Sequence, residues 1–431
     1  MRVRRIELAA GTPEQATALA RTIRAFAPRP ADLGAAVSEI LEGVRSRGDE
    51  AVLEFSRRFD SENAPVESRV LGDRLDAALQ ELDSDVRSAL ETAIANVRMV
   101  AEADLKDETL VALPQGQQVR IQDIAVERAG IYVPGGRAPY PSTVVMGCVP
   151  AKVAGVDRVV VASPPADNGE PNPVVLAACA LCGVDEVYAI GGVQAIAALA
   201  FGTPTVPRVD VIVGPGNDYV QEAKRQVTGV VGIDGIEGPS ELVVIADEHA
   251  RAELIALDLA AQAEHGPGTL LVLLSDSDSL LEEVAKEVEQ LTFEYESTAD
   301  AAIALVRVPD LTAAVELANA LAPEHLEIAS SNAEELTTGV RASGCIFTGQ
   351  NGGAAFGDYA AGSNHVLPTG GAARFASPLG VATFRRRQAL VSLPDGAARA
   401  LAPHVSSLAR AEGFPVHAAS AEARAGDRDR A

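Results

Sequence analysis

From residue 129 onwards, short apolar runs alternate with longer segments whose apolar residues recur at helical spacing. The runs have the length of strands, and the segments between them have the length of helices. Strands joined through helices form right-handed crossovers and predict a parallel sheet. The first set has expected strands at 130–133, 158–162, 186–190 and 209–213, and expected helices at 143–154, 173–182, 193–200 and 218–227.

A second set of the same kind follows the first along the chain. Its expected strands lie at 242–246, 269–274, 302–306 and 345–347, and its expected helices at 251–264, 279–290 and 311–321. Two consecutive sets indicate two related halves of doubly wound type. We therefore predict the α/β fold class, with two doubly wound (Rossmann-like) parallel-sheet units plus helical N- and C-terminal extensions.

The pattern also suggests how the chain divides into domains. Residues 1–125 are expected to be mostly helical, and the glycine-rich segment 349–371 predicts a long functional loop. We expect four parts: an N-terminal helical extension over 1–30, a discontinuous first α/β domain over 31–128 and 239–375, a second α/β domain over 129–238, and a C-terminal helical tail over 376–431.

Composition supports a buried sheet and argues against two classes of partner. Hydrophobic residues make up 47% of the chain and aromatic residues only 4%, so Ala, Val, Leu and Ile must build the core. The formal net charge of −24 repels the phosphates of nucleic acids and anionic lipids. The longest apolar runs are too short to span a bilayer. We expect neither a nucleic-acid nor a membrane partner.

The four cysteines favour a reducing compartment over a disulfide framework. Cys179 and Cys182 form a single C-x-x-C in an Ala- and Leu-rich helical stretch, without the second pair that a zinc knuckle needs. We interpret both as buried helix residues, with redox or metal chemistry as the alternative. Residues 1–10 lack the apolar core of an export signal, so we expect a cytoplasmic protein.

No G-x-G-x-x-G motif occurs, but two glycine turns follow expected strands, at Gly135-Gly136 and at Gly214-Pro215-Gly216-Asn217. At the carboxyl ends of parallel strands, such turns present backbone N–H groups to a ligand. Turns between strands and helices also contain glycine for structural reasons. A cofactor role and a purely structural role both stay open on this evidence.

Gln262 and His265 are three residues apart at the end of an expected helix, which places both side chains on one face. An imidazole and a side-chain oxygen suit a borderline cation such as zinc. Asp358 could add a carboxylate, and His417 could add a second imidazole. The alternative is that all four are unrelated helix-end and loop residues.

Glu324 and His325 form an acid–imidazole pair just before an apolar, strand-like run. Two adjacent bases of different strength suit proton transfer, and the imidazole titrates near neutral pH. Taken alone, the pair also fits a turn with solvated charges.

Eight segments in this order resemble the motifs of the histidinol dehydrogenase family, over about 40–417. Any one of them is unspecific, whereas eight in register exclude chance agreement. The segments are GIYVPGG (130–136), YPSTVVMGCVPAKVAGV (140–156), GGVQAIAALAFGT (191–203), GPGNDYVQEAKRQV (214–227), GPSELVVIAD (238–247), QAEHGP (262–267), APEHLEI (322–328) and GDYAAGSNHVLPT (357–369).

The resemblance implies a homodimer that oxidises L-histidinol to L-histidine with two NAD, through an L-histidinal that stays bound. It implies one Zn²⁺ per subunit, held by Gln262, His265, Asp358 and His417 of the partner subunit, so that the C-terminal tail is a dimer arm. It further implies that NAD binds in the domain 129–238, where it contacts Tyr132, Gln194 and Asn217.

The same resemblance makes Glu324 and His325 the catalytic pair. It implies that the substrate contacts Ser240, Gln262, His265, His325, Asp358, His365, Glu412 and His417. Zinc would hold the amine and imidazole nitrogens of the substrate. His325 would take the hydroxyl proton and assist the second oxidation, and Glu324 would deprotonate the water that attacks the aldehyde. No Cys nucleophile is needed.

Two departures from the family pattern bear on positioning. Glu237 precedes Gly238, where the family usually has a small residue, and the stretch 350–356 is richer in glycine. Neither departure removes an expected ligand.

Two other functions stay open. One is a related zinc and NAD dehydrogenase that acts on another polar alcohol, such as a sulfonated diol, although Glu412, His417 and His365 together favour the imidazole substrate. The other is a non-catalytic metal- or nucleotide-binding relative, which the intact pair Glu324 and His325 disfavours. Turnover of a panel of alcohols would separate the three.

Overall fold

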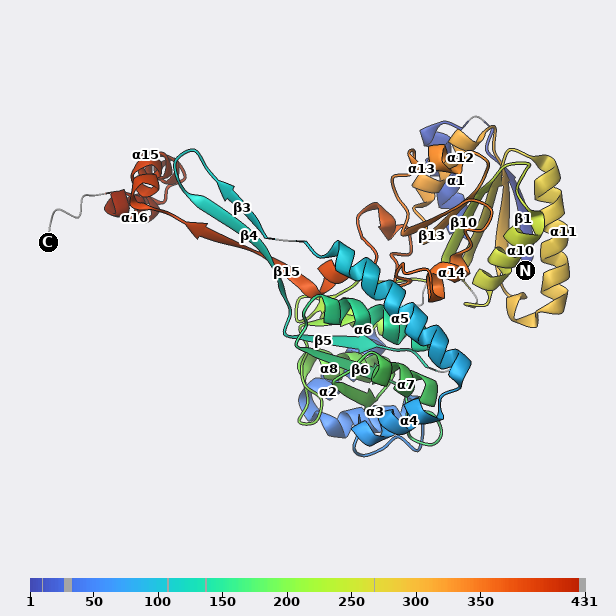
Figure 1. Ribbon diagram of the computed structural model, residues 1–431, viewed down its shortest axis with the longest axis horizontal. Helices are drawn as coiled ribbons and strands as arrows, with labels where there is room; N and C mark the ends of the chain where they lie inside the picture. The colour runs from blue at the N-terminus through green and yellow to red at the C-terminus, as the bar shows by residue number, and fades with distance from the viewer. Residues whose placement is uncertain (10, 27–32, 107, 136–137, 267, 426–431) are drawn as a thin grey trace. The chain divides into compact units, whose positions relative to one another are not determined.

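The computed structural model describes residues 1–9, 11–26, 33–106, 108–135, 138–266 and 268–425 (Figure 1). Its helices and strands form two compact units. The first unit consists of Met1–Ala103 and Val126–Phe384, and the second of Asp104–Ala125 and Arg385–Ala431. Within the described ranges, no helix has the length and apolar character needed to cross a membrane.

One six-stranded sheet of the first unit is entirely parallel. In spatial order its strands are β1 (Arg2–Glu7), β12 (Ala302–Arg307), β11 (Leu270–Ser275), β10 (Glu241–Ala246), β13 (His325–Ala329) and β14 (Cys345–Thr348). Strands β10, β11 and β13 are buried along their whole length, because helices cover both faces of the sheet.

Two hydrophobic cores lie on the two faces of this sheet. One contains residues of α1 (Pro13–Arg24), α12 (Leu311–Leu321) and α13 (Ala333–Thr337). The other contains residues of α10 (Ala252–Ala263), α11 (Asp278–Glu294) and α14 (Ala354–Tyr359), and the short helix η1 (Glu296–Thr298) follows α11.

The second six-stranded sheet of the first unit is parallel except at one edge, where β2 runs antiparallel to β7. In spatial order its strands are β2 (Arg69–Val70), β7 (Glu186–Ala189), β6 (Arg158–Ser163), β5 (Arg128–Tyr132), β8 (Val211–Val213) and β9 (Gly232–Ile233). Side chains alternate between its faces, so that Val161 lies in one core and Val160 in the other.

Helices cover both faces of this sheet as well. One core contains residues of α4 (Gly72–Glu81), α5 (Ser84–Asp104), α6 (Pro141–Val153), α7 (Pro173–Leu181) and the short helix η3 (Val381–Phe384). The other contains residues of α2 (Gly34–Arg47), α3 (Asp49–Phe59), α8 (Gly192–Phe201) and α9 (Asp218–Val227). The predicted α/β fold class with two parallel-sheet units is confirmed.

Elements of the first third of the chain pack differently from the expected division. Within residues 1–9 and 11–26, β1 pairs in parallel with β12 and α1 packs against α12, so these residues join that sheet and do not form a separate helical extension. Helices α2 to α5 lie in the same compact unit as 239–375 but pack on the sheet of 129–238, and the strands β3 and β4 belong to the second unit. Helical spacing shows that a helix buries one face, but it does not identify the sheet that receives this face.

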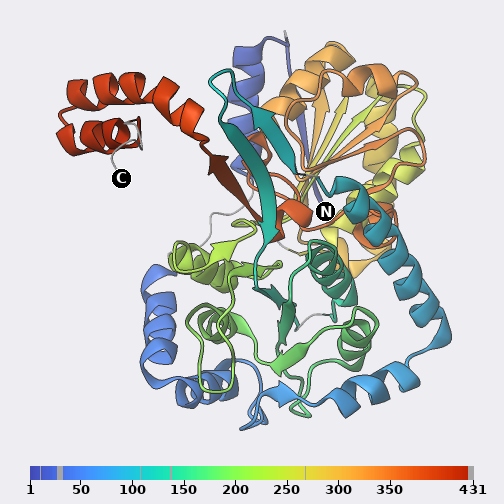
Figure 2. The ribbon, with the colours of Figure 1, turned by 60° about the vertical axis from the view of Figure 1, so that its left-hand side comes forward.

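The second unit is a three-stranded antiparallel sheet followed by a helical pair. The order β15 (Arg385–Ser392), β4 (Gln118–Ala125), β3 (Thr109–Ala112) joins segments from both halves of the chain. Helices α15 (Asp395–Ala411) and α16 (Pro415–Ala425) then pack against each other (Figure 2). The expected C-terminal tail over 376–431 is therefore not helical throughout, since η3 and strand β15 precede these helices. The short helix η2 (Ala372–Arg374) also precedes this tail.

Candidate functional site

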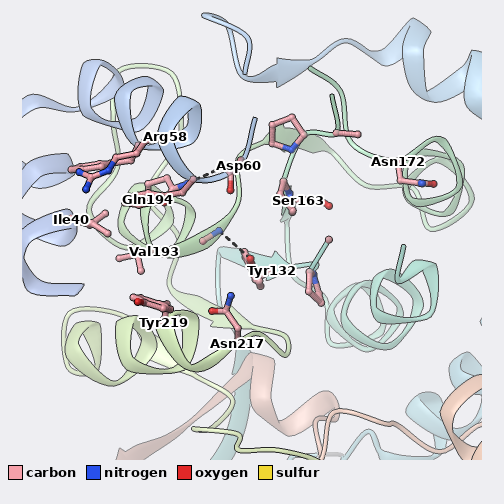
Figure 3. A pocket seen from close by; sticks show the side chains of 18 of the residues that line it. Ile40, Arg58, Asp60, Tyr132, Ser163, Asn172, Val193, Gln194, Asn217 and Tyr219 are labelled. Atoms are coloured by element: carbon pink, nitrogen blue, oxygen red, sulfur yellow. Dashed lines mark hydrogen bonds between the residues drawn. The ribbon is translucent and has the colours of Figure 1, made fainter. Parts of the chain in front are cut away.

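A cavity of about 970 Å³ lies at the carboxyl ends of strands β5, β6, β7 and β8 (Figure 3). The three residues expected to contact NAD, Tyr132, Gln194 and Asn217, all line it. Ligands of open parallel sheets bind at this edge, and the volume is typical of a cofactor site. The structure therefore brings the three expected cofactor residues to one cavity.

A half-buried carboxylate fixes one wall of the cavity. Asp60 follows α3, and its Oδ2 accepts hydrogen bonds from Nε2 of Gln194 at 2.9 Å and from the backbone N–H of Gly191 at 3.0 Å. Because Nε2 of Gln194 is engaged in this way, its carbonyl oxygen is the group left to accept from a ligand. Burial raises the pKa of Asp60 above its usual value, and the two hydrogen bonds favour the ionised form.

Tyr132 ends strand β5, and its hydroxyl accepts a hydrogen bond from the backbone N–H of Gly192 at 3.1 Å. Burial raises the pKa of Tyr132 to about 12, so the phenol is neutral at physiological pH. Its hydroxyl therefore keeps a proton to donate. The first residues of α8, Gly192 included, are thus held by side chains of the cavity wall.

A buried ion pair holds the turn that carries Asn217. The Lys224 ammonium contacts Oδ1 of Asp234 at 2.5 Å and donates to the backbone oxygen of Gly214 at 3.0 Å. Oδ2 of Asp234 accepts from the N–H of Gly214 at 2.7 Å. Asn217 in turn caps α9 by accepting from the N–H of Val220 at 3.1 Å. The glycine turn is rigid for reasons that its own sequence does not reveal.

The acid–imidazole pair lies at the amino end of β13, in the sheet that contains β10. Glu324 precedes this strand and His325 begins it, opposite Leu242 of β10. Both residues are buried, with 6% and 2% of their surface exposed. This burial excludes the solvated turn that the sequence alone left open.

His325 lies between two carboxylates. Its Nδ1 is 3.6 Å from Oε2 of Glu324, and its Nε2 is 3.4 Å from Oδ1 of Asp358. Burial lowers the pKa of His325, but the two carboxylates outweigh burial and raise it well above its usual value. The phenyl ring of Phe347 stacks against the imidazole, with ring centres 6.0 Å apart. The imidazole orientation is therefore fixed from three sides.

Gln262 and His265 lie together at the carboxyl end of α10, as their spacing predicts. Nε2 of Gln262 is 3.4 Å from Nδ1 of His265, which is also 3.0 Å from Oγ of Ser240. Ser240 directly precedes β10. Because α10 runs antiparallel to the strands, its end meets the same edge of the sheet as the start of β13.

Asp358, in α14, reaches the same edge. Burial raises the pKa of Asp358, but the hydrogen bond from His325 and the nearby imidazoles of His365 and His265 outweigh burial and lower it. In the part of the chain that the structure describes, no three His, Cys, Asp or Glu side chains are arranged to hold a metal ion. The expected set has only His265 and Asp358 of these types in the first unit, with the Gln262 amide as a third donor. Imidazole, carboxylate and amide oxygen are donors that zinc accepts, so these three residues fit this ion.

His365 lies beside this group. Its Nδ1 is 2.8 Å from the backbone oxygen of Asp358, and its Nε2 is 3.5 Å from the hydroxyl of Thr143. Burial lowers the pKa of His365, which favours the neutral imidazole. A carbonyl only accepts, so Nδ1 carries the proton and Nε2 is an acceptor.

Two expected site residues lie in the second unit. Glu412 ends α15, and His417 lies in α16, where its ring is 5.4 Å from that of Phe414. Both side chains are exposed. The two residues are close in sequence. A site that includes them would need the second unit of this chain or of another copy.

Sequence reasoning missed several residues that shape these sites. Asp60 and Gly191 are 131 positions apart, and no local pattern links them. Lys224 and Asp234 read as ordinary surface charges. Glu241 is buried and pairs with Arg24 of α1 at 2.6 Å, although both look like exposed helix or strand residues in the sequence.

Comparisons with known proteins agree with one another. The model of a family described as histidinol dehydrogenase matches residues 27–425. A histidinol dehydrogenase of Aromatoleum aromaticum is 46% identical over 406 residues, covering 92% of each chain. One of Nitrosospira multiformis is 44% identical over 408 residues, covering 91% of each chain. The crystal structure of histidinol dehydrogenase from Elizabethkingia anophelis has a TM-score of 0.91 at 29% identity, covering 98% of each chain.

The family model covers both six-stranded sheets apart from β1, and it covers the described part of the second unit. It includes the cavity residues, the pair Glu324 and His325, and the group around Asp358. The chain therefore belongs to the histidinol dehydrogenase family of oxidoreductases.

Proposed function

We propose that this protein oxidises L-histidinol to L-histidine, through L-histidinal that stays bound, in the last steps of histidine biosynthesis. The observation that carries the proposal is the buried pair Glu324 and His325 next to the donors Asp358, Gln262 and His265 at one edge of a sheet. A buried acid and imidazole beside a set of metal donors suit proton removal from a bound alcohol. The relatives' names supply the substrate.

We assign zinc to Gln262, His265 and Asp358, with His417 of the partner subunit as the fourth ligand. When bound, zinc would supply positive charge that holds and polarises the substrate's nitrogen and oxygen atoms. His265 is already oriented by Ser240, and Asp358 by His325. Contacts of this kind fix the direction of metal ligands.

The first oxidation needs a base for the hydroxyl proton. We assign this proton to His325, which accepts it as the neutral imidazole. Zinc on Asp358 would offset the charge of one of the two carboxylates that raise the pKa of His325. The carbinol hydrogen leaves as hydride to the nicotinamide of NAD. The product is the aldehyde, with two electrons in NADH and one proton on the imidazole. Ser240 and His365 are placed to hold the substrate beside His325, since Nε2 of His365 is an acceptor for a donor group of the ligand.

The second oxidation needs water and a second NAD. We assign Glu324 as the base that deprotonates the water attacking the aldehyde carbon. One oxygen of Glu324 already accepts from the N–H of Glu241 at 2.8 Å, which leaves the other to bind water. The resulting hydrate transfers hydride to NAD with assistance from His325, and the carboxylic acid forms. Two NADH per histidine balance the four electrons.

NAD is assigned to the 970 Å³ cavity, against Tyr132, Gln194 and Asn217. The hydroxyl donor of Tyr132 and the amide oxygen of Gln194 suit the hydroxyl groups and the carboxamide of a dinucleotide. Asp60 supports this role indirectly, because it orients the Gln194 amide.

We further propose a homodimer in which the second unit completes the partner's site with Glu412 and His417. Support comes from the exposed apolar side chains Leu408, Phe414 and Val416, which are 67%, 52% and 77% exposed on this unit. Apolar surface of this kind favours a protein partner. We place the enzyme in the cytoplasm, where the free thiols, Cys148 among them, stay reduced.

Turnover of histidinol by zinc-supplemented enzyme tests the proposal. We expect two NADH for each histidine formed, and no turnover after chelation. A panel that includes sulfonated diols serves as the comparison. Turnover of such a diol without turnover of histidinol would reassign the substrate, and bound zinc with no NAD reduction by any alcohol would indicate a non-catalytic relative.

A further inference from the structure

The start of α14 is held by a buried carboxyl group that the proposed reaction does not use. Glu327 lies in β13, two residues after His325, and is 3% exposed. Its Oε1 accepts a hydrogen bond from the backbone N–H of Ala354 at 2.7 Å. Ala354 is the first residue of α14, and Asp358 lies in the last turn of this short helix. One side chain therefore connects the strand of His325 with the helix of Asp358.

A second carboxyl group reaches the same helix start from another element. Asp258 lies in α10 four residues before Gln262, and thus on the same face of that helix. Oδ1 of Asp258 would be 2.8 Å from a Cβ at Gly353, so any larger residue there would displace the carboxyl group. Helices α10 and α14 pack against each other and share one hydrophobic core (Figure 1).

The other end of α14 is packed just as closely. A Cβ at Gly357 would lie 2.4 Å from the ring of Phe347, the ring that stacks on His325. Helix α14 is thus held at its start by the hydrogen bond to Glu327, beside which the Asp258 carboxyl group packs, and by an aromatic ring near Asp358. Six residues are too few for a helix to hold its own geometry in water, so these contacts must determine where Asp358 lies.

The surroundings of Glu327 determine its protonation state. Burial and then the charge of Asp258 raise the pKa of Glu327 to about 8. Burial also raises the pKa of Asp258, to about 6. Two neighbouring carboxyl groups resist simultaneous ionisation, so Glu327 is a neutral acid near pH 7. In that form its carbonyl oxygen accepts from Ala354, and no unpaired negative charge is buried next to Asp358.

We propose that Glu327 and Asp258 are positioning residues, which fix the start of α14 and so hold the Asp358 carboxylate in place relative to Gln262 and His325. Each of the three elements that they join carries one group of the proposed centre: α10 carries Gln262, β13 carries His325, and α14 carries Asp358. The effect on metal binding rests on the proposed function, whereas the effect on α14 does not.

Three variants test this role. Glu327→Ala removes the acceptor for the Ala354 N–H, whereas Glu327→Gln keeps it and mimics the neutral acid. Asp247→Ala is the matched control, because Asp247 is another buried carboxylate beside the same sheet and accepts from the N–H of Ser331 at 2.8 Å. Asp247 follows β10 at the carboxyl edge of the sheet, away from Gln262 and Asp358.

Two readouts are measured on the full-length protein, namely zinc affinity by chelator competition and amide hydrogen exchange over 353–359 without metal. For Glu327→Ala we expect zinc affinity to fall by about 10- to 100-fold and exchange over 353–359 to accelerate. For Glu327→Gln we expect zinc affinity within about threefold of wild type and unchanged exchange. For Asp247→Ala we expect a lower melting temperature with neither change.

The two readouts separate the failure of this inference from that of the proposed function. Unchanged exchange over 353–359 in Glu327→Ala would overturn the inference whether or not the protein binds zinc. Equal loss of zinc affinity in Glu327→Ala and Asp247→Ala would also overturn it, because the effect would then be general destabilisation. Wild-type protein that binds no zinc would overturn the proposed metal site, while the exchange data would still decide the role of Glu327.

Discussion

The carboxylate of Glu324 is held by the backbone N–H of Glu241, with 2.8 Å between Oε2 and the nitrogen. This contact joins the starts of two neighbouring parallel strands, β13 and β10. It fixes the acid without neutralising it, since a backbone N–H carries no charge. Glu324 is thus oriented for proton transfer by the sheet itself.

Glu324→Gln should separate the two oxidations. Gln still accepts from the Glu241 N–H, but it cannot deprotonate water. We expect oxidation of histidinal to fall by about 10² to 10⁴-fold, and oxidation of histidinol to histidinal to change by less than about tenfold. Single-turnover measurements with each substrate decide this. Equal losses in both half-reactions would contradict the assigned role of Glu324.

A shared site predicts complementation between two inactive variants. His417→Ala should lower zinc affinity and activity in a homodimer, and Glu324→Gln should block turnover to histidine. In randomly mixed dimers, half pair the two variants, and each such dimer has one intact site. We therefore expect about a quarter of wild-type activity after unfolding and refolding an equal mixture. No recovery, with dimers formed, would place His417 in its own subunit's site or in none.

Asp60→Ala should weaken NAD binding through Gln194. The change removes the acceptor for Nε2 of Gln194 and for the Gly191 N–H. We expect KM for NAD to rise about tenfold, with kcat and zinc content nearly unchanged, as for the loss of one buried hydrogen-bond network. Titration of NAD against the variant provides a check without turnover. A fall in kcat at unchanged KM would show that Asp60 acts on the chemical step.

The buried carboxyl group of Glu327 should make the free energy of unfolding depend on pH. Its pKa in the folded protein, about 8, lies above its ordinary value of 4.5, mainly through burial and then through Asp258, while His325 opposes the rise and Asp358 adds to it. The folded state thus binds this proton more tightly than the unfolded state does. The resulting stability is fully present at low pH and is lost as pH rises towards 8.

Glu327→Gln cannot ionise and should escape this loss. Melting temperatures of the variant and of wild type are compared without metal. We expect the difference in favour of the variant to grow by a few degrees between pH 6 and pH 9. Glu241→Gln is not a suitable control because it breaks the ion pair with Arg24, so Asp247→Asn is used instead. A constant difference across this range would show that Glu327 is ionised throughout.

The central strands of both sheets were predictable because they are uniform. Strand β6 reads RVVVAS, and helices bury both of its faces, so an unbroken apolar run is enough to identify it. Strand β13 reads HLEIA; its apolar part was expected as a strand-like run after Glu324 and His325, but it was not placed among the strands of the second set. Its polar residues His325 and Glu327 are buried at the candidate site, and their polarity does not indicate a buried strand in the sequence. Strand β1, RVRRIE, could not be identified from its sequence because it is an exposed edge strand with mostly charged residues.

Only part of the candidate site could be read from local spacing. Gln262 and His265 share a helix face, and their contact follows from that spacing. Asp358 was a candidate ligand from its residue type alone, and His365 was identified through the family resemblance, because nothing near either residue in the sequence shows what it approaches. Asp60, Lys224 and Glu327 act through contacts with distant segments, which only the fold reveals.

The second unit has a consequence for how the protein is made. Strand β4 takes all eight residues of β15 as its antiparallel neighbour, and these two strands come from opposite halves of the chain. During synthesis on the ribosome, one edge of the β3–β4 hairpin remains unpaired until residues 385–392 emerge. In that interval the unpaired edge is available to chaperones or to another chain. A chain whose translation stalls before β15 cannot form this sheet.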